Sequence, residues 1–551
     1  MGEKRFAMGV DYGTGSVRSA IFNLADGSEI ASAVYAYPHG EDGVVVDPNN
    51  HLLARQEPAD YVNGLFETIR TAVNEAKKLG FDESYLAGIG VDATSSTPIP
   101  VDAAGTPLAF APKFADNPSA MAWLWKDHTS FAEADLINER ARPLHLLDRC
   151  GGTASSEWSW AKILHCKKEA PDVIASAFSW VELADYIPGV LTGNLDPMTM
   201  ARGICGAGHK AIYDERWGGL PSEEFLASLD PDLVPLRSRY APALSAEKIA
   251  GYLTPENAQK TGLLAGTPVA VGAIDAHLGG VGAGVRSGRM VAIIGTSTCY
   301  MLVHPLSEPL ADIPGISGIV PGSILPGMYG LEAGQTATGD IFNWFVKNFT
   351  PAKYYQSGDP HAALSAAASK LRPGESGLLA LDWNNGNRST LDDPLLTGLT
   401  LGTTLHTTAP EMYRALIEAT AFGARTIVER YTDYGVPVNE VVTCGGVAEK
   451  NPLLMQIYAD ILNRPMKISR SDQSCALGAA IFGAVAGGAF PDTLAAVGAM
   501  TGVKETVYTP NPQNAPIYDK IFALYTKLYN AFGGVNQPET VADVMKEMLR
   551  L

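Results

Sequence analysis

Short runs of apolar residues, each closed by a glycine or a carboxylate, recur along the chain and predict buried β-strands. Three of these runs end on an aspartate: residues 6–10 lead to Asp11, residues 86–91 to Asp92 and residues 269–274 to Asp275. Short β-branched strands of this kind are typical of layered α/β proteins. Ligands in such sheets bind outside the carboxyl ends of the strands. Asp275 therefore lies where a ligand is expected.

A fourth apolar run, residues 290–294, breaks into the turn Gly295-Thr296-Ser297-Thr298. The backbone N–H groups and hydroxyls of such a turn suit an oxyanion, while Asp275 at the end of the preceding strand offers a base. Together the two features favour a site for phosphoryl transfer.

A similar turn, Asp11-Tyr12-Gly13-Thr14-Gly15-Ser16, joins the strand at 6–10 to a strand at 17–24. Strand–turn–strand is a hairpin rather than the strand–turn–helix of a Walker loop, and the turn contains no Gly-Lys-Ser/Thr. Its glycines let the backbone approach a ligand closely. Taken alone, such a turn is more often just a hairpin turn. The pair of turns instead predicts a duplicated fold with a nucleotide between its halves.

The hydrophobic positions at 61–79 and 412–431 follow the 3.6-residue period of amphipathic helices. The other predicted elements, in chain order, are helices at 159–168 and 180–192, a loop at 206–210, a helix from 339, a strand at 440–443, a helix from about 451, a packed helix at 476–490 and two helical pieces within 515–551.

Length and charge narrow the classes of function. A chain of 551 residues is too long for one hydrophobic core, so two large domains are expected. The composition, 46% hydrophobic and 18% charged, is that of a globular enzyme rather than a disordered chain. A net charge of −18 argues against nucleic acid and anionic membranes as partners, since both select basic surfaces.

The cysteines and the apolar stretches predict a cytoplasmic protein. The six cysteines contain no Cys-x-x-Cys and do not cluster with histidine, which favours a reducing compartment over disulfides or zinc. The first residues reach Asp11 too soon for a signal-peptide core. The longest apolar stretch, 476–490, is shorter than the roughly 20 residues that a membrane span needs.

Four polar segments have two interpretations each, and the residues alone leave both open. The loop at 93–98 is either a ligand-binding loop or a turn capped by Asp92. Residues 123–128 either line a sugar pocket or pack in a core. Lys210 contacts a ligand or is a solvated lysine, and Gly445-Gly446 accepts a flat ring or makes a tight turn.

Ten segments in order through nearly the whole chain resemble the FGGY family of carbohydrate kinases. They are residues 11–16, 90–98, 124–128, 155–158, 207–210, 274–277, 294–299, 330–335, 444–447 and 475–480. The resemblance implies an α/β fold of two duplicated ribonuclease-H-like domains, as in actin and hexokinase, around an interdomain cleft. Residues 1–285 would hold the sugar site, the first phosphate hairpin and the base. Residues 286–551 would hold the second hairpin and the adenosine pocket.

The same resemblance implies MgATP-dependent phosphorylation of a sugar hydroxyl. The segments at 125–128, 207–210 and 330–335 resemble the branch of the family that phosphorylates ketopentoses. The implied substrate is L-ribulose, phosphorylated at the 5-hydroxyl in L-arabinose catabolism, with D-ribulose and related ketoses or polyols as alternatives. The family also implies a homodimer. Because a kinase needs closure to avoid simple hydrolysis of ATP by water, we expect the two halves of the chain to rotate together when sugar and nucleotide bind.

Residue roles carry over from the family by position. Asp275 matches the catalytic base, and Asp11 with Asp275 the Mg²⁺ ligands. The residues that match the ATP site are Gly13, Thr14, Gly15, Ser16, Gly295, Thr296, Ser297, Gly339, Asn343, Gly445, Gly446 and Asn451. The residues that match the sugar site are Ser96, Thr97, Trp125, Lys126, Asp127, Lys210, Asp275, Ala276, Glu332 and Gln335. Two departures from the family pattern, Ala93 and Thr400, lie outside these sets.

Two other classes of protein compete with this interpretation. A non-catalytic actin-like ATP-binding protein would share the hairpins but would need neither a carboxylate at 275 nor a sugar pocket. A dinucleotide oxidoreductase would explain the glycines at 280–288, but these lack the strand–GxGxxG–helix context and the acidic residue about 20 positions later.

Overall fold

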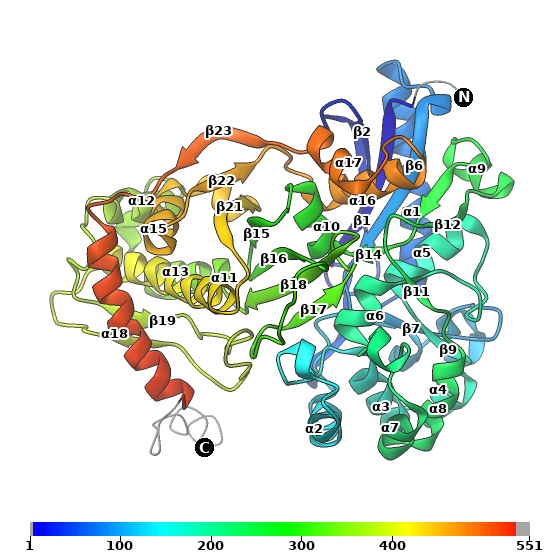
Figure 1. The fold of residues 1–551 in the computed structure, drawn as a ribbon, viewed down its shortest axis with the longest axis horizontal. Helices are drawn as coiled ribbons and strands as arrows, with labels where there is room; N and C mark the ends of the chain where they lie inside the picture. The colour runs from blue at the N-terminus through cyan, green and yellow to red at the C-terminus, as the bar shows by residue number, and fades with distance from the viewer. Residues whose placement is uncertain (1–3, 536–551) are drawn as a thin grey trace.

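The computed structural model describes residues 4–535 of the chain and contains two large mixed sheets (Figure 1). The first sheet has the order β12-β13-β6-β1-β2-β3, and β14 also pairs with β6. Its strands are β1 (Phe6–Tyr12), β2 (Ser16–Asn23), β3 (Glu29–Ala36), β6 (Leu86–Ala93), β12 (Ile249–Tyr252), β13 (Pro268–Ala270) and β14 (Ala273–Ile274).

The second sheet has the order β17-β18-β16-β15-β21-β22-β23. Its strands are β15 (Gly288–Ile294), β16 (Thr298–Pro305), β17 (Gly318–Pro321), β18 (Met328–Gln335), β21 (Val438–Cys444), β22 (Met466–Ser469) and β23 (Val503–Tyr508). In each sheet one strand pairs antiparallel with its hairpin partner and parallel with a strand that comes much later: β1 with β2 and β6, β15 with β16 and β21. This repeat confirms the predicted duplication.

Small sheets and helices complete the two halves. The remaining strands are β4 (Val45–Asp47), β5 (Asn50–Gln56), β7 (Pro98–Val101), β8 (Ala122–Trp123), β9 (Ser179–Glu182), β10 (Arg202–Gly203), β11 (Ala243–Leu244), β19 (Leu379–Leu381) and β20 (Leu399–Leu401). The helices up to residue 282 are α1 (Pro58–Lys78), α2 (Phe131–Ala141), α3 (Ser159–Glu169), α4 (Pro171–Ser176), α5 (Leu183–Thr192), α6 (Ile204–Lys210), α7 (Glu223–Leu229), α8 (Val234–Ser238), α9 (Pro255–Thr261) and α10 (Asp275–Gly282). The later helices are α11 (Gly339–Phe349), α12 (Pro360–Ala368), α13 (Ala409–Asp433), α14 (Gly446–Lys450), α15 (Pro452–Leu462), α16 (Ser474–Ala486), α17 (Thr493–Met500) and α18 (Ala515–Gly533).

Helix α16 belongs to the second half of the chain but packs on the first sheet (Figure 1). A Cβ at Gly9 of β1 would lie 1.8 Å from the carbonyl oxygen of Ala476, and one at Gly90 of β6 the same distance from that of Ala479. Glycines at these positions therefore let the helix backbone rest directly on the strands. Helices α10 and α16 pack together, and their small apolar side chains form a buried layer that contacts both sheets.

Four predicted elements differ from the structure. Residues 180–192 are not one helix, because residues 179–182 form β9, which pairs with β7 inside a buried layer. Residues 206–210 are not a loop but lie within α6, where a Cβ at Gly208 would meet Val320 at 2.3 Å. The strand at 269–274 is split between β13 and β14, since Gly272 lies against the carbonyl of Ala184. A short helix, α14, begins at Gly446, ahead of the helix predicted from about 451.

The predicted hairpin at the N-terminus, the two amphipathic helices and the helix from 339 are confirmed as β1–β2, α1, α13 and α11. The first predicted helical piece after 515 is α18, and the second lies outside the described residues. Within residues 4–535, the helices are all too short or too polar to cross a membrane.

Candidate active site

Three aspartates meet at the carboxyl ends of neighbouring strands of the first sheet. Asp11 and Asp92 are register partners on the parallel strands β1 and β6, and Ala273 of β14 pairs with Asp92 on its other side. Asp275 follows directly as the first residue of α10. Chain topology thus brings together carboxylates that are about 80 and 180 residues apart, at the edge of the sheet where ligands of such folds bind.

Asp92 is the most constrained of the three carboxylates. Its side chain is fully buried, and neither oxygen has a hydrogen-bond partner among the described residues. Burial raises the pKa of Asp92 well above its ordinary value, and the charges of Asp11 and Asp275 raise it further. Burial likewise raises the pKa of Asp11. Carboxylates gathered in this way are the donor set of a hard cation such as Mg²⁺.

Asp275 is poised to exchange a proton near neutral pH. Burial and then the charge of Asp11 raise its pKa to about 7. The backbone N–H of Ala276 donates to its Oδ1 over 2.7 Å, and the ammonium of Lys210 also favours the charged form. A general base works best when its pKa lies near the working pH.

Lys210 and Glu332 form an ion pair between the two halves of the chain. Lys210 ends α6 and Glu332 lies in β18, with Nζ 3.3 Å from Oε2. Burial opposes the charge on Glu332, but the nearby cation Lys210 holds the pKa of the carboxyl well below its usual range. Glu332 in turn keeps the pKa of Lys210 raised despite burial. The interpretation of Lys210 as a solvated loop lysine is therefore wrong.

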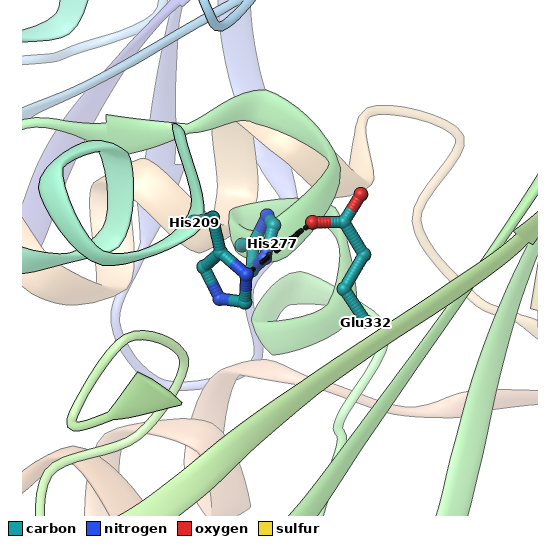
Figure 2. A group of neighbouring side chains, drawn as sticks. All are labelled: His209, His277 and Glu332. Atoms are coloured by element: carbon teal, nitrogen blue, oxygen red, sulfur yellow. Dashed lines mark ion pairs between the residues drawn. The ribbon is translucent and has the colours of Figure 1, made fainter. Parts of the chain in front are cut away.

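Two histidines lie behind the same carboxylate (Figure 2). His209 Nδ1 and His277 Nε2 are 3.4 and 3.5 Å from Glu332 Oε2. Burial lowers the pKa of His277 to about 4 and that of His209 well below its ordinary value. Both imidazoles are therefore neutral at pH 7.

The turn with Ser96 and Thr97 is held by two buried charged side chains. Glu182 accepts hydrogen bonds from Ser96 Oγ and from the backbone N–H of Thr97, each over 2.8 Å. Lys162 Nζ donates to the carbonyl of Ser96 over 2.7 Å and to that of Leu124 over 2.8 Å. The same lysine therefore joins both polar segments that the sequence left open.

Residues 123–128 divide between the core and the first hairpin. Trp123 is fully buried, whereas Trp125 is partly exposed and its Nε1 donates to Thr14 Oγ1 over 3.0 Å. Lys126 is exposed. Asp127 is fully buried and forms an ion pair with Arg55.

Gln335 is also fully engaged inside the protein, where it accepts from Tyr300 and donates to Asp382 and to the carbonyl of Thr420. Ala276 lies beside Asp275 and is partly exposed. Four of the predicted sugar-site residues are buried and can only support the candidate site: Ser96, Thr97, Asp127 and Gln335. Three others keep some exposed surface: Trp125, Lys210 and Glu332.

Each of the two predicted phosphate hairpins is closed by a backbone hydrogen bond from its first glycine to a serine. The backbone N–H of Gly13 donates to the carbonyl of Ser16, and that of Gly295 to the carbonyl of Ser297. Thr14, Gly15 and Ser16 are partly exposed, Thr296 is exposed and Ser297 is partly exposed. The peptide groups at both tips are therefore available to an anion.

Two further segments are predicted to adjoin the second hairpin. The N–H groups of Gly339 and Asp340, which open α11, donate to the carbonyls of Gly295 and Thr296. Gly445 has φ +101°, and a Cβ there would lie 2.4 Å from the carbonyl of Ile294. Gly446 has no atom within 4 Å of a would-be Cβ, so its face is open.

The last two predicted nucleotide residues flank this region. Asn343 is exposed on α11. Asn451 is buried and caps α15, where its side chain accepts from the N–H of Leu454 over 3.1 Å. The sequence predicts both as nucleotide contacts; the geometry gives Asn451 a structural bond as well.

Comparison with known proteins identifies the family. Residues 6–282 match the N-terminal domain of the FGGY family of carbohydrate kinases, and residues 290–487 match its C-terminal domain. The chain belongs to the FGGY family of carbohydrate kinases. It is therefore a sugar kinase, for which ATP is the phosphoryl donor.

Relatives within the family cover nearly all of the chain. A protein from Bacillus licheniformis named ribulokinase is 42% identical over 97% of each chain, and one of the same name from Mycolicibacterium smegmatis is 42% identical over 97% of this chain and 95% of its own. The crystal structure of xylulose kinase from Rhodospirillum rubrum has a TM-score of 0.79 at 23% identity and covers 95% of this chain and 98% of that one. The last match shows the fold alone, and it agrees with the predicted two-domain actin-like fold.

Three residues of the candidate site, Asp92, Lys162 and Glu182, were not recognised from the sequence. Asp92 carried a signal, because it ends a buried strand as Asp11 and Asp275 do. No feature of the sequence marks Glu182, because the pattern at 180–192 predicts a helix where the structure has β9. In the sequence, Lys162 stands out only as a lysine within a predicted helix, next to the apolar residues 160–161 and 163–164.

Proposed function

We propose that this FGGY kinase is an ATP-dependent ribulokinase that phosphorylates L-ribulose at its 5-hydroxyl. The observation that carries the proposal is the near-complete match to proteins named ribulokinase at 42% identity. The local geometry supports it, since a base, an ammonium and a second carboxylate (Asp275, Lys210 and Glu332) converge where the resemblance places a ketose.

Asp275 is the catalytic base of the proposed reaction. In the loose transition state of phosphoryl transfer, the protein mainly positions the groups and neutralises charge. Asp275 accepts the proton of the attacking sugar hydroxyl, and its pKa of about 7 lets it do so at neutral pH. The carboxylate of Glu332 and the ammonium of Lys210 orient the remaining sugar hydroxyls by hydrogen bonds.

The nucleotide binds between the two hairpins in this proposal. Backbone N–H groups at residues 13–16 and 295–297 receive the phosphates, and the adenosine lies near Gly339, Asn343, Gly445, Gly446 and Asn451. Asp11 and Asp275 would hold Mg²⁺, with Asp92 beside them, and the unpaired buried oxygens of Asp92 fit such an ion. Bound there, Mg²⁺ would neutralise charge on the phosphates.

Closure of the two halves, 1–285 and 286–551, would exclude water from the transferred phosphoryl group. A kinase that stays open hydrolyses ATP, because water is always more abundant than the sugar. Lys210 and Glu332 come from different halves, so a sugar that contacts both would favour the closed state. Solution scattering should therefore show compaction with both sugar and an ATP analogue; an unchanged radius of gyration would exclude closure.

We also propose a cytoplasmic homodimer that takes a ketopentose and MgATP as its small-molecule partners. All six cysteines are free thiols in the structure, which fits a reducing compartment. Light scattering of the purified protein tests the dimer, since a mass near 58.4 kDa would identify a monomer instead.

A coupled ATP-consumption assay against a panel of pentuloses, pentitols and glycerol, with a blank lacking sugar, tests the function. Strong stimulation by L-ribulose is expected, and Asp275→Asn should lower kcat by about 10²–10⁴-fold while ATP still binds. A higher rate with another pentulose or a polyol would reassign the substrate. ATP turnover that ignores every sugar would leave an actin-like ATP-binding protein.

A further inference from the structure

Three potential ligand atoms converge where α6, α10 and β18 meet (Figure 2). They are Nδ1 of His209, Nε2 of His277 and Oε2 of Glu332, all within 4.8 Å of one another. The histidine side chains are fully buried, and Glu332 is nine-tenths buried. In Figure 2 both rings lie on the same side of the glutamate carboxylate, and the dashed ion pairs run from one carboxylate oxygen to the two rings.

The hydrogen bonds around His209 determine which of its ring nitrogens carries the proton. The hydroxyl of Ser323 donates to the carbonyl of Val320 over 3.0 Å, so its oxygen can only accept from His209 Nε2, 3.1 Å away. In the neutral ring Nδ1 is then unprotonated. It lies 3.4 Å from a carboxylate oxygen and has no hydrogen-bond partner among the described residues. Two acceptors at this distance repel each other unless a proton or a metal ion lies between them.

His277 presents the same unsatisfied chemistry. Both of its ring nitrogens are buried without a hydrogen-bond partner in the described part of the chain, although buried polar groups are nearly always paired. Its Nε2 lies 3.5 Å from the same oxygen of Glu332. The two imidazoles are tilted neighbours, with ring centroids 4.3 Å apart.

We propose that His209, His277 and Glu332 form a site for a divalent transition-metal ion of the zinc class, separate from the Mg²⁺ that accompanies ATP. Two imidazoles and one carboxylate, with a fourth position for water, are a common ligand set of Zn²⁺. Ligands about 2.0–2.1 Å from a tetrahedral ion lie about 3.4 Å from one another. The two measured nitrogen–oxygen distances, 3.4 and 3.5 Å, match this spacing, and all three ligand atoms lie within 4.8 Å of one another, so a small movement of the side chains would close them on the ion.

The ligand set also separates this site from Mg²⁺. Mg²⁺ prefers octahedral oxygen ligands and keeps much of its water, whereas imidazole nitrogen selects Zn²⁺, Co²⁺ and Ni²⁺. The aspartates at 11, 92 and 275 offer oxygen only. Excess Mg²⁺ should therefore leave the histidine site to the transition metal.

Metal at this site would regulate the kinase, a consequence that rests on the proposed function. Glu332 is also the partner of Lys210, 3.3 Å away, and one of the residues proposed to hold the sugar. A bound metal ion draws the carboxylate away from Lys210 and from the sugar hydroxyls. The metal should thus inhibit by competition with the sugar and not with MgATP.

Calorimetric titration of the chelator-treated full-length protein with Co²⁺ or Zn²⁺, in excess Mg²⁺, tests the site. We expect one tightly bound ion per chain and, for Co²⁺, a visible absorption band of tetrahedral intensity. His277→Gln and His209→Gln should each weaken binding by at least tenfold. His304→Ala is the control: His304 is also buried, and neither ring nitrogen has a hydrogen-bond partner among residues 4–535, but its Nε2 lies 3.7 Å from Glu308 and it stands outside the cluster.

A variant that should bind the metal more tightly distinguishes loss of the site from loss of folding. Lys210→Met removes a competing cation from Glu332 and should tighten metal binding by about tenfold, since two cations this close repel even at the effective dielectric of a protein. No bound Co²⁺ in the wild type, or equal weakening by His304→Ala and His277→Gln, would overturn the site. Calorimetry needs no turnover, so metal binding without sugar phosphorylation would refute the proposed function alone. Metal binding without competition against the sugar would refute the inhibitory role.

Discussion

Lys162 offers a sharp test of how the sugar side of the site is built. This lysine is fully buried on α3, and its ammonium donates to the carbonyls of Ser96 and Leu124. Burial lowers its pKa from 10.5 to about 7, although Glu182 partly opposes this shift. Lys162→Met keeps the length of the side chain and removes every donor.

The sign of the pH dependence follows from the depressed pKa of Lys162. Between pH 7 and about 10 the unfolded chain binds one proton more than the native chain at this residue, so native stability rises with pH. The slope is about 1.4 kcal/mol per pH unit. Below pH 7 both states are protonated and the full cost of the buried charge remains. Lys162→Met has no such slope.

The size of the loss at high pH comes from the unpaired carbonyls. Each buried acceptor left without a donor costs about 1–3 kcal/mol, so Lys162→Met should lose about 2–6 kcal/mol near pH 9. The loss should be much smaller at pH 6, where the wild type bears the buried charge. The sugar KM should also rise by about tenfold or more while the KM for ATP changes little, because Ser96 and Leu124 lose a common anchor.

Urea unfolding of the wild type and Lys162→Met from pH 6 to 9.5, together with KM measurements, provides the comparison. Lys168→Met is the matched control, since Lys168 lies on the same helix with an exposed side chain paired to Glu133. Parallel stability curves for wild type and Lys162→Met would refute the depressed pKa. Equal changes in the two KM values would refute the role in positioning the sugar segments.

Three further outcomes are expected. Lys210→Met should raise the KM for sugar far more than that for ATP, because its partner is Glu332; equal increases would contradict the assignment. The kcat/KM for sugar should fall as pH drops through about 7, since protonated Asp275 accepts no proton, and a flat profile down to pH 5 would exclude this base. Trp125→Phe removes the hydrogen bond to Thr14 and should raise the KM for ATP as well as for sugar, whereas an effect on sugar alone would place Trp125 apart from the hairpin.

The parts of the site that the sequence predicted are those set by local pattern. Asp11 and Asp275 each follow an apolar run. A carboxylate at the end of a buried strand lies at the carboxyl edge of the sheet, where ligands bind. The hairpin at residues 13–16 is likewise specified by glycines and by strands on both sides of it. Such signals need no knowledge of distant residues.

The parts that the sequence did not predict depend on partners far along the chain. Glu182 holds Thr97 from 85 residues away, and Lys162 holds Ser96 from 66 residues away. A short stretch such as 179–182, Ser-Trp-Val-Glu, fits a strand or a helix equally well until its pairing partner is known. Likewise, α6 contains two glycines and was predicted as loop, but tight packing of Gly208 on Val320 selects the helix.

All three aspartates lie on elements that pack against α16, and this contact limits how the two halves of the chain can rotate. Asp11 and Asp92 lie near the ends of the strands that contact α16 through Gly9 and Gly90. Asp275 begins α10, and the carbonyl of Leu278 in α10 lies 1.9 Å from a would-be Cβ on Gly478 of α16. A rotation that slid α16 along the strands would drive its backbone into theirs. The closure we propose must therefore pivot about α10 and α16, so that the carboxylates stay in register while the second hairpin and Glu332 approach them.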